Sequence, residues 1–250
     1  MNKISAESGF QLLYRFNEKP SLSDLDNILF PNGLKGGDIV QLTGESAVGK
    51  STLLLKYLTK SLLPKYYNGV FLGGLNVGVI LIDTSHGISI LKLVCLMEKF
   101  ISQTCECLTK SGSLKWFISF IKLQKLIYYP ILNIYFFLIE SIEILSNPDN
   151  VKDIVNNSLK NLIILKTYTS LQLEMNYYSI EKILATDSKS SMIIIDSLTF
   201  YYWSDLEKNK NFKKSDFYLK FWVEKFSKYA EEYDIAVIFS TEGKIKILTV

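Results

Sequence analysis

Short apolar runs, rich in β-branched residues, alternate along the chain with longer stretches of helical periodicity. From residue 37 onward the pattern predicts strands at 39–43, 79–82, 162–165, 192–195 and 235–239. It predicts helices at 50–63, 88–101, 171–184 and 215–233, with a glycine-rich loop at 68–78. Because strands that alternate with helices form parallel sheets, we expect an α/β fold with a doubly wound, mostly parallel sheet.

The segment 108–150 interrupts this alternation and is rich in Phe, Tyr and Ile. Its longest run without a charged residue, 126–139, has 14 residues and contains Pro130 and Asn133. A helix needs roughly 20 apolar residues to cross a bilayer, so we expect burial or contact with a partner instead of a membrane span. Two interpretations of the segment remain open: a partner-binding insertion, or a translated intron.

The composition, 48% hydrophobic and 21% charged over 250 residues, is typical of one large α/β domain. The formal net charge of +3 is too small to predict a nucleic-acid partner by itself. Arg15 is the single arginine, so two-pronged capture of phosphate or guanine is almost excluded. Residues 1–10 lack the apolar run of a secretory signal, and we expect Cys95, Cys105 and Cys107 to be free thiols in a reducing compartment.

A phosphate-binding loop is indicated at residues 44–51, which match G-x-x-x-x-G-K-[ST] between a predicted strand and a predicted helix. Its glycines allow backbone N–H groups to surround a phosphate, and the helix N-terminus adds its dipole. We expect Lys50 to contact β- and γ-phosphate oxygens and the Ser51 hydroxyl to bind Mg²⁺. The nucleoside triphosphate would be held by Gly44, Glu45, Ser46, Ala47, Val48, Gly49, Lys50, Ser51 and Thr52.

A carboxylate is also needed to hold the magnesium ion, and two aspartates end predicted strands. Asp196 follows the apolar run 193–195, at the end of the strand where open α/β sheets place ligands. Asp83 follows 79–82 in the same way and is the alternative. Because Asp196 lies on the later strand, we assign the metal to Ser51 and Asp196, and we expect residues 83–85 to occupy the place of a water-activating acid.

Several of these segments resemble the core of RecA-like recombinases in order and spacing: 44–51, 82–84, 193–203 and 237–241. The opening residues 6–9 and 12–13, together with 82–94, narrow the resemblance to the eukaryotic recombinase paralogues. The resemblance covers about residues 5–105 and 158–242. It implies a P-loop NTPase core at 37–250, interrupted by the aromatic-rich segment, shortened at its C-terminal end and preceded by a segment, 1–36, with the potential to contact a partner.

The resemblance also implies a function. Such a protein would bind ATP and Mg²⁺, reside in the nucleus and act in homologous-recombination repair of DNA double-strand breaks. It would join a complex with another recombinase paralogue and assist loading of the recombinase on single-stranded or branched DNA.

Two residues depart from the pattern of active recombinases. Ser85 stands where the water-activating glutamate is expected, and a serine does not accept that proton usefully at neutral pH. The neighbouring His86 could substitute, although a surface loop histidine is the simpler interpretation. Glu242 stands near the expected position of a glutamine that senses the γ-phosphate, and a carboxylate would repel that phosphate. We therefore expect nucleotide binding with slow or absent hydrolysis.

Residues 205–214 fall where the first DNA-binding loop of a recombinase lies. Four lysines and one aromatic residue of this segment suit sequence-independent binding of a DNA backbone and stacking on a base: Lys208, Lys210, Lys213, Lys214 and Phe212. A solvated loop is the alternative interpretation. Two other functions also stay open, an active DNA-dependent ATPase of the same fold and, less favoured because arginines are lacking, a small-molecule kinase.

Overall fold

The computed structural model describes residues 19–110, 139–208, 215–243 and 246–249. The strands are β1 (Ile39–Gly44), β2 (Tyr66–Tyr67), β3 (Val70–Phe71), β4 (Gly78–Asp83), β5 (Leu162–Lys166), β6 (Ser190–Asp196), β7 (Ala236–Glu242) and β8 (Lys246–Thr249). The helices are α2 (Lys50–Leu62), α3 (Ile90–Lys110), α6 (Pro148–Leu159), α7 (Ser170–Thr186), α8 (Tyr202–Lys208) and α9 (Ser215–Tyr233).

Six of these strands form one sheet in the order β5-β4-β6-β7-β1-β8. The first five strands of that order run parallel, whereas β8 lies antiparallel to β1. The carboxyl ends of the parallel strands therefore meet at one edge of the sheet, where ligands bind in open α/β folds. The predicted mostly parallel α/β sheet is confirmed.

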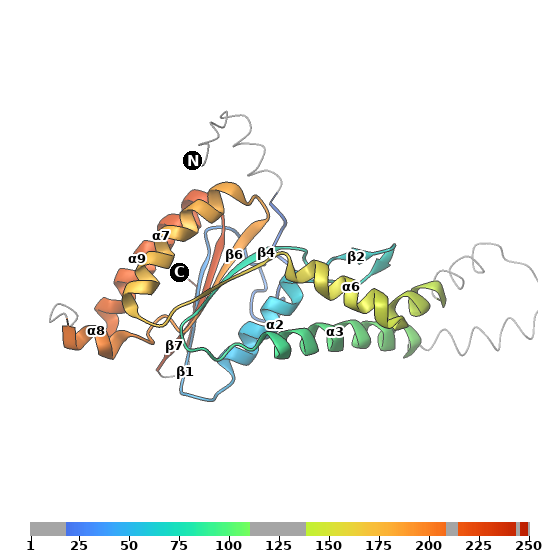
Figure 1. Cartoon of the computed structure of the whole chain (residues 1–250), viewed down its shortest axis with the longest axis horizontal. Coiled ribbons are helices and arrows are strands. Elements are labelled where there is room, and N and C mark those ends of the chain that lie inside the picture. Colours follow the sequence, from blue (N-terminus) through green and yellow to red (C-terminus); the bar gives the residue numbers. More distant parts are fainter. Residues whose placement is uncertain (1–18, 111–138, 209–214, 244–245, 250) are drawn as a thin grey trace, which may run out of the picture.

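Both faces of the sheet are covered by helices (Figure 1). Side chains alternate along each strand, so Val79 and Leu81 of β4 join the core on the α2, α3 and α6 side. Ile80 and Ile82 of the same strand join the core on the α7 and α9 side. Because both cores are apolar, the central strands read as continuous hydrophobic runs, which is the pattern that the sequence shows.

Aromatic side chains join α7 to α9. The ring of Tyr177 stacks on that of Tyr229 with centroids 4.5 Å apart and meets Phe226 edge-on at 5.5 Å. The Lys225 ammonium lies over the Tyr177 ring at 5.2 Å and also contacts the Glu174 carboxylate at 3.1 Å. These contacts hold the two helices side by side on one face of the sheet (Figure 1).

The described part of the N-terminal segment packs against the core. Leu22, Leu25, Phe30 and Leu34 are buried beside α2 and its neighbours. The Tyr57 hydroxyl of α2 donates to the Asp26 carboxylate at 3.3 Å. Residues 19–36 are thus integral to the fold, and the predicted partner contact of 1–36 stays a prediction.

Several elements differ from those that the sequence predicts. The stretch 68–78, expected to be a loop, contains β3, which pairs with β2 in a two-stranded hairpin. The helix expected to end at 101 continues to Lys110. The aromatic-rich segment 108–150 is described only at its margins, where residues 139–146 and the start of α6 are helical. Leu145 is buried in the core beside α3, so this margin belongs to the packed domain.

None of the helices in the described ranges is long and apolar enough to cross a membrane. The three cysteines are free, as the sequence predicts.

Candidate functional site

The loop between β1 and α2 has the backbone that a phosphate cradle requires. Gly49, immediately before α2, has a φ of 100°, which glycine adopts without strain. A Cβ at this position would meet nothing within 4 Å, so conformation and not space demands the glycine. The Gly49 carbonyl accepts the first helical bond, from Leu53 N–H at 2.9 Å, which leaves the earlier amides of α2 available to an anion.

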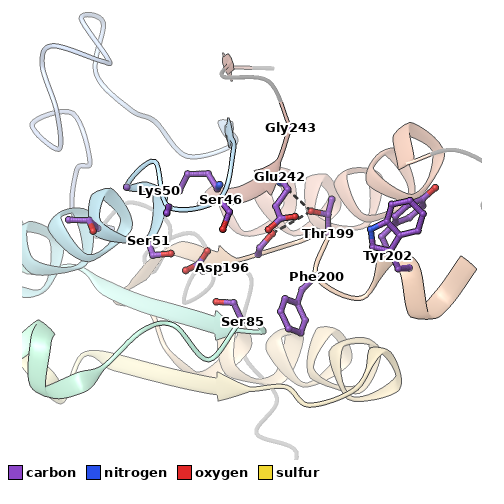
Figure 2. Close-up of a pocket in the computed structure, with 15 residues that line it drawn as sticks. Ser46, Lys50, Ser51, Ser85, Asp196, Thr199, Phe200, Tyr202, Glu242 and Gly243 are labelled. Carbon is purple, nitrogen blue, oxygen red and sulfur yellow. Dashed lines mark hydrogen bonds between the residues drawn. The ribbon is translucent and has the colours of Figure 1, made fainter.

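Lys50 closes this loop. Its ammonium donates to the carbonyl oxygens of Gly44 at 2.8 Å and Glu45 at 2.7 Å. The ammonium is therefore held above the loop by the backbone of the loop itself, beside the hollow that the loop borders (Figure 2). A phosphate in that hollow would meet the positive charge directly.

A cavity of about 800 Å³ opens along the loop at the carboxyl edge of the sheet. It is lined by residues of the loop and of three other segments: Ser46, Ala47, Gly49, Lys50, Ser51, Thr52, Ser85, Asp196, Ser197, Thr199, Phe200, Tyr202, Trp203, Glu242 and Gly243. The sequence predicts six of these loop residues, whereas Gly44, Glu45 and Val48 of the predicted set do not line the cavity.

The structure separates the two candidate metal acids. Asp83 and Asp196 are register partners on β4 and β6, and both are buried. Asp196 lines the cavity together with Ser51, whereas Asp83 does not. The Ser240 hydroxyl donates to Asp196 Oδ1, and Asp196 Oδ2 is buried with no hydrogen-bond partner among the described residues. A carboxylate oxygen and a hydroxyl in one cavity are ligands that Mg²⁺ prefers, so these residues fit the ion.

Asp83 lies behind the cavity wall in a setting that opposes its ionisation. Burial is the largest cause that raises the pKa of its carboxyl, and the nearby Asp196 charge adds to it. The His86 imidazole and backbone N–H act in the opposite direction. Asp83 therefore supports the loop 84–87 from within the fold and does not contact the cavity contents.

Ser85 lines the cavity, as expected of the position that would carry a water-activating acid. Its hydroxyl accepts from the Gly87 backbone N–H at 3.3 Å. His86 is exposed, stacks on Tyr168 with ring centroids 4.5 Å apart, and is absent from the cavity lining. The interpretation of His86 as a surface loop histidine fits this geometry. The described lining keeps two carboxylates, Asp196 and Glu242, but neither lies in the loop after β4, where the water-activating acid is expected and Ser85 stands.

Glu242 ends β7 and lies opposite Gly44 in the parallel register of β1 and β7. It lines the cavity, and its backbone N–H donates to Thr199 Oγ1 at 3.5 Å. Figure 2 shows the side chains of Ser46, Asp196 and Glu242 around the same hollow. Glu242 therefore borders the same cavity as the phosphate loop, and its proximity to a terminal phosphate stays a prediction.

Sequence reasoning did not assign the aromatic wall of the cavity. Phe200 and Trp203 are 51% and 71% exposed, and Tyr202 is buried behind them. These residues follow directly on the β6 strand that carries Asp196. Their position could have predicted this wall from the sequence, because the segment that follows a parallel strand begins at the carboxyl edge of the sheet, where the phosphate loop also lies.

The segment 205–214 is not a loop throughout. Residues 202–208 form α8, and Asp205 accepts hydrogen bonds from Ser170 Oγ at 2.6 Å and Tyr218 Oη at 3.1 Å. Lys208 ends this helix. Lys210, Phe212, Lys213 and Lys214 lie outside the described residues, so their role in binding DNA stays a prediction.

The strand order and the loop after β1 define an α/β protein with the RecA-like arrangement. The chain is 25% identical over 202 residues to the mouse protein named DNA repair protein XRCC2. The aligned region covers 80% of this chain and 54% of the mouse protein. It is 24% identical over 179 residues to the Arabidopsis thaliana DNA repair protein XRCC2 homolog, covering 69% of this chain and 43% of that protein. No protein-family model matches. The chain spans about half the length of these curated relatives, and the similarity supports a recombinase paralogue of the XRCC2 type.

Proposed function

We propose that this chain is a nucleotide-binding accessory protein of DNA repair by homologous recombination. The observation that carries the proposal is the single cavity bordered by the phosphate loop, Lys50, Ser51 and Asp196. The relatives named as DNA repair proteins support the biological role. Its expected location is the nucleus.

ATP and magnesium are the proposed ligands of the cavity. The loop amides and Lys50 would hold the phosphates, and Ser51 and Asp196 would hold the ion. When bound, Mg²⁺ neutralises phosphate charge. Asp196 Oδ2 and Asp83 Oδ1 are both buried without a hydrogen-bond partner among the described residues, and such oxygens are costly unless a ligand satisfies them. The metal role of Asp196 is supported because it lines the cavity beside Ser51, whereas Asp83 does not.

Hydrolysis is proposed to be slow or absent. Ser85 replaces an acid at the cavity wall, and His86 lies outside the lining. Positioning and charge neutralisation remain without a base at the end of β4, so the chain acts through binding. Turnover above about 1 s⁻¹, the low end for enzymes, would instead favour the active ATPase.

The proposed partners are a second recombinase paralogue and single-stranded or branched DNA, bound without regard to sequence. The chain would contribute to an assembly that helps the recombinase load on DNA. Co-elution of the purified chain with a purified recombinase paralogue in size-exclusion chromatography tests this part of the proposal.

Calorimetry with magnesium nucleotide tests the nucleotide-binding part. We expect wild-type protein to bind at millimolar ligand or below and Lys50→Ala to bind at least about tenfold more weakly, a loss of about 1.4 kcal/mol. Lys228→Ala, which removes an exposed lysine of α9, is the matched control and should bind as wild type does. No heat of association with folded wild-type protein would contradict the proposal.

A further inference from the structure

The cavity has an unusual balance of charge for a site that holds phosphates. Among the described residues that line it, Lys50 carries the one positive charge, whereas Asp196 and Glu242 carry carboxylates. Arg15, the single arginine of the chain, lies outside the described residues. The magnesium complexes of a diphosphate and a triphosphate bring the same ion, so a further phosphoryl group adds negative charge to a site whose described lining has two carboxylates and one lysine.

The two carboxylates have different roles. Asp196 is fixed by Ser240 and directs a buried, orphaned oxygen to a place where a metal ion would satisfy it. Glu242 is at the exposed end of β7, and the hydrogen bond recorded for it is made by its backbone N–H to Thr199. Its carboxylate is thus not required to hold the strand in place, and it remains a charge that faces the cavity (Figure 2).

Register brings this charge close to the phosphate loop. Glu242 pairs with Gly44, the residue at which β1 passes into the loop. The β-phosphate of a nucleotide has the loop amides and the Lys50 ammonium as partners, whereas a γ-phosphate would have Lys50 as its one cation among the described lining residues. A third phosphate would have to share the Lys50 charge in the presence of Glu242.

We propose that Glu242 makes this site select a nucleoside diphosphate over a nucleoside triphosphate. The inference rests on the proposed nucleotide binding by residues 44–51. It keeps ATP as a ligand of the site and makes the diphosphate the more tightly bound of the two. Repulsion between like charges near a protein surface amounts to several kcal/mol at contact and falls with distance and with salt. The carboxylate therefore selects by weakening the triphosphate complex and not by adding a contact to the diphosphate.

The test compares dissociation constants for two probes, Mg-ADP and the magnesium complex of a non-hydrolysable ATP analogue, measured by calorimetry. We expect the wild-type chain to bind Mg-ADP about tenfold more tightly than the analogue, equivalent to about 1.4 kcal/mol. Glu242→Gln keeps the size of the side chain and should bring the ratio close to one by tightening analogue binding. Glu231→Gln removes the charge of an exposed residue on α9 and should keep the wild-type ratio.

Ionic strength provides a second readout. Raising potassium chloride from about 0.05 to 0.5 M shortens the Debye length from above 10 Å to below 5 Å, so the wild-type ratio should shrink and the Glu242→Gln ratio should change little. Equal unfolding midpoints of the two proteins without ligand show that the fold is unchanged.

The outcomes separate this inference from the proposed function. Binding of both probes with one ratio in wild type and Glu242→Gln overturns the selection by Glu242 and leaves nucleotide binding intact. Failure of wild-type protein to bind either probe overturns both. A ratio that moves only in Glu242→Gln supports both.

Discussion

The left-handed backbone of Gly49 matters both for the stability of the fold and for the shape of the proposed phosphate loop. Its φ of 100° is strained for any side chain, and a Cβ would have open space, so the cost of Gly49→Ala is conformational. We expect Gly49→Ala to lower the free energy of unfolding by about 1–3 kcal/mol in urea denaturation, with a large loss of nucleotide affinity.

Gly37 provides the matched control, because it has a φ of 86° and equally open surroundings, but lies outside the cavity lining. Gly37→Ala should lose similar stability and keep nucleotide affinity. If both variants lose affinity equally, the Gly49 backbone does not shape the phosphate loop specifically.

The ionisation of Asp83 makes the free energy of unfolding depend on pH. Its raised pKa means that the folded chain binds a proton more tightly than the unfolded chain. The protonated form therefore contributes stability that is present below the ordinary aspartate pKa of about 4, and this contribution is lost as pH rises through the folded-state pKa. Asp83→Asn remains neutral and can still accept from the His86 N–H.

We expect urea denaturation without magnesium to show Asp83→Asn more stable than wild type at pH 7, with the difference shrinking as pH falls toward about 3.5. Asp153→Asn, at an exposed position of α6, also removes one carboxylate charge and is the comparison. A constant difference across the pH range would show that ionisation of Asp83 is not disfavoured by the fold.

At this scale, the sequence predicted the loop residues because they are consecutive and their pattern carries the chemistry. The sequence favoured Asp196 over Asp83 only through the order of the strands, since both residues end apolar strands and they are register partners. What distinguishes them is that only Asp196 reaches the cavity, and this depends on how β6 and β7 pack. Thr199 and Phe200 were missed because no motif marks them, although their position directly after β6 places them at the same edge of the sheet.

Three helices are joined through one carboxylate. Asp205 of α8 accepts hydrogen bonds from Ser170 of α7 and Tyr218 of α9. Asp205→Ala removes the Oδ2 atom that accepts both hydrogen bonds, and we expect the free energy of unfolding to fall by about 1–3 kcal/mol in urea denaturation. The exposed neighbour Glu207→Ala on the same helix should change stability by less than about 0.5 kcal/mol. Equal effects would show that α8 does not depend on this connection.

The elements themselves were predicted well where periodicity and burial coincide. β4 and β6 are apolar on both faces, and their runs identify them without knowledge of the fold. α3 was predicted too short because the buried stripe of Leu93, Met97 and Ile101 continues after residue 101 only through the half-buried Cys105 and Leu108, in turns that otherwise carry polar residues. α8 was missed because seven residues hold too little periodicity, and its position is set by Asp205.

The whole chain carries a net charge of +3 from many lysines and one arginine, so any contact with DNA depends on lysines that read no base sequence. We expect single-stranded DNA to bind regardless of sequence, with an affinity that falls steeply with salt. The variant in which Lys208, Lys210, Lys213 and Lys214 are replaced by Ala should bind more weakly, and the slope of log affinity against log salt should fall by up to roughly 3.

Total charge must be separated from position in this experiment. A control that replaces the exposed Lys56, Lys99, Lys182 and Lys228 by Ala also removes four positive charges, so both variants share one net charge. Fluorescence anisotropy with a labelled oligonucleotide at several salt concentrations compares them. If the segment 208–214 contacts the DNA backbone, only the first variant shows a lower affinity and a shallower slope of log affinity against log salt. The reason is that long-range attraction is the same for both variants and only short-range phosphate contacts differ. Equal losses in both variants would mean that the molecule attracts DNA by overall charge and that this segment is a solvated surface.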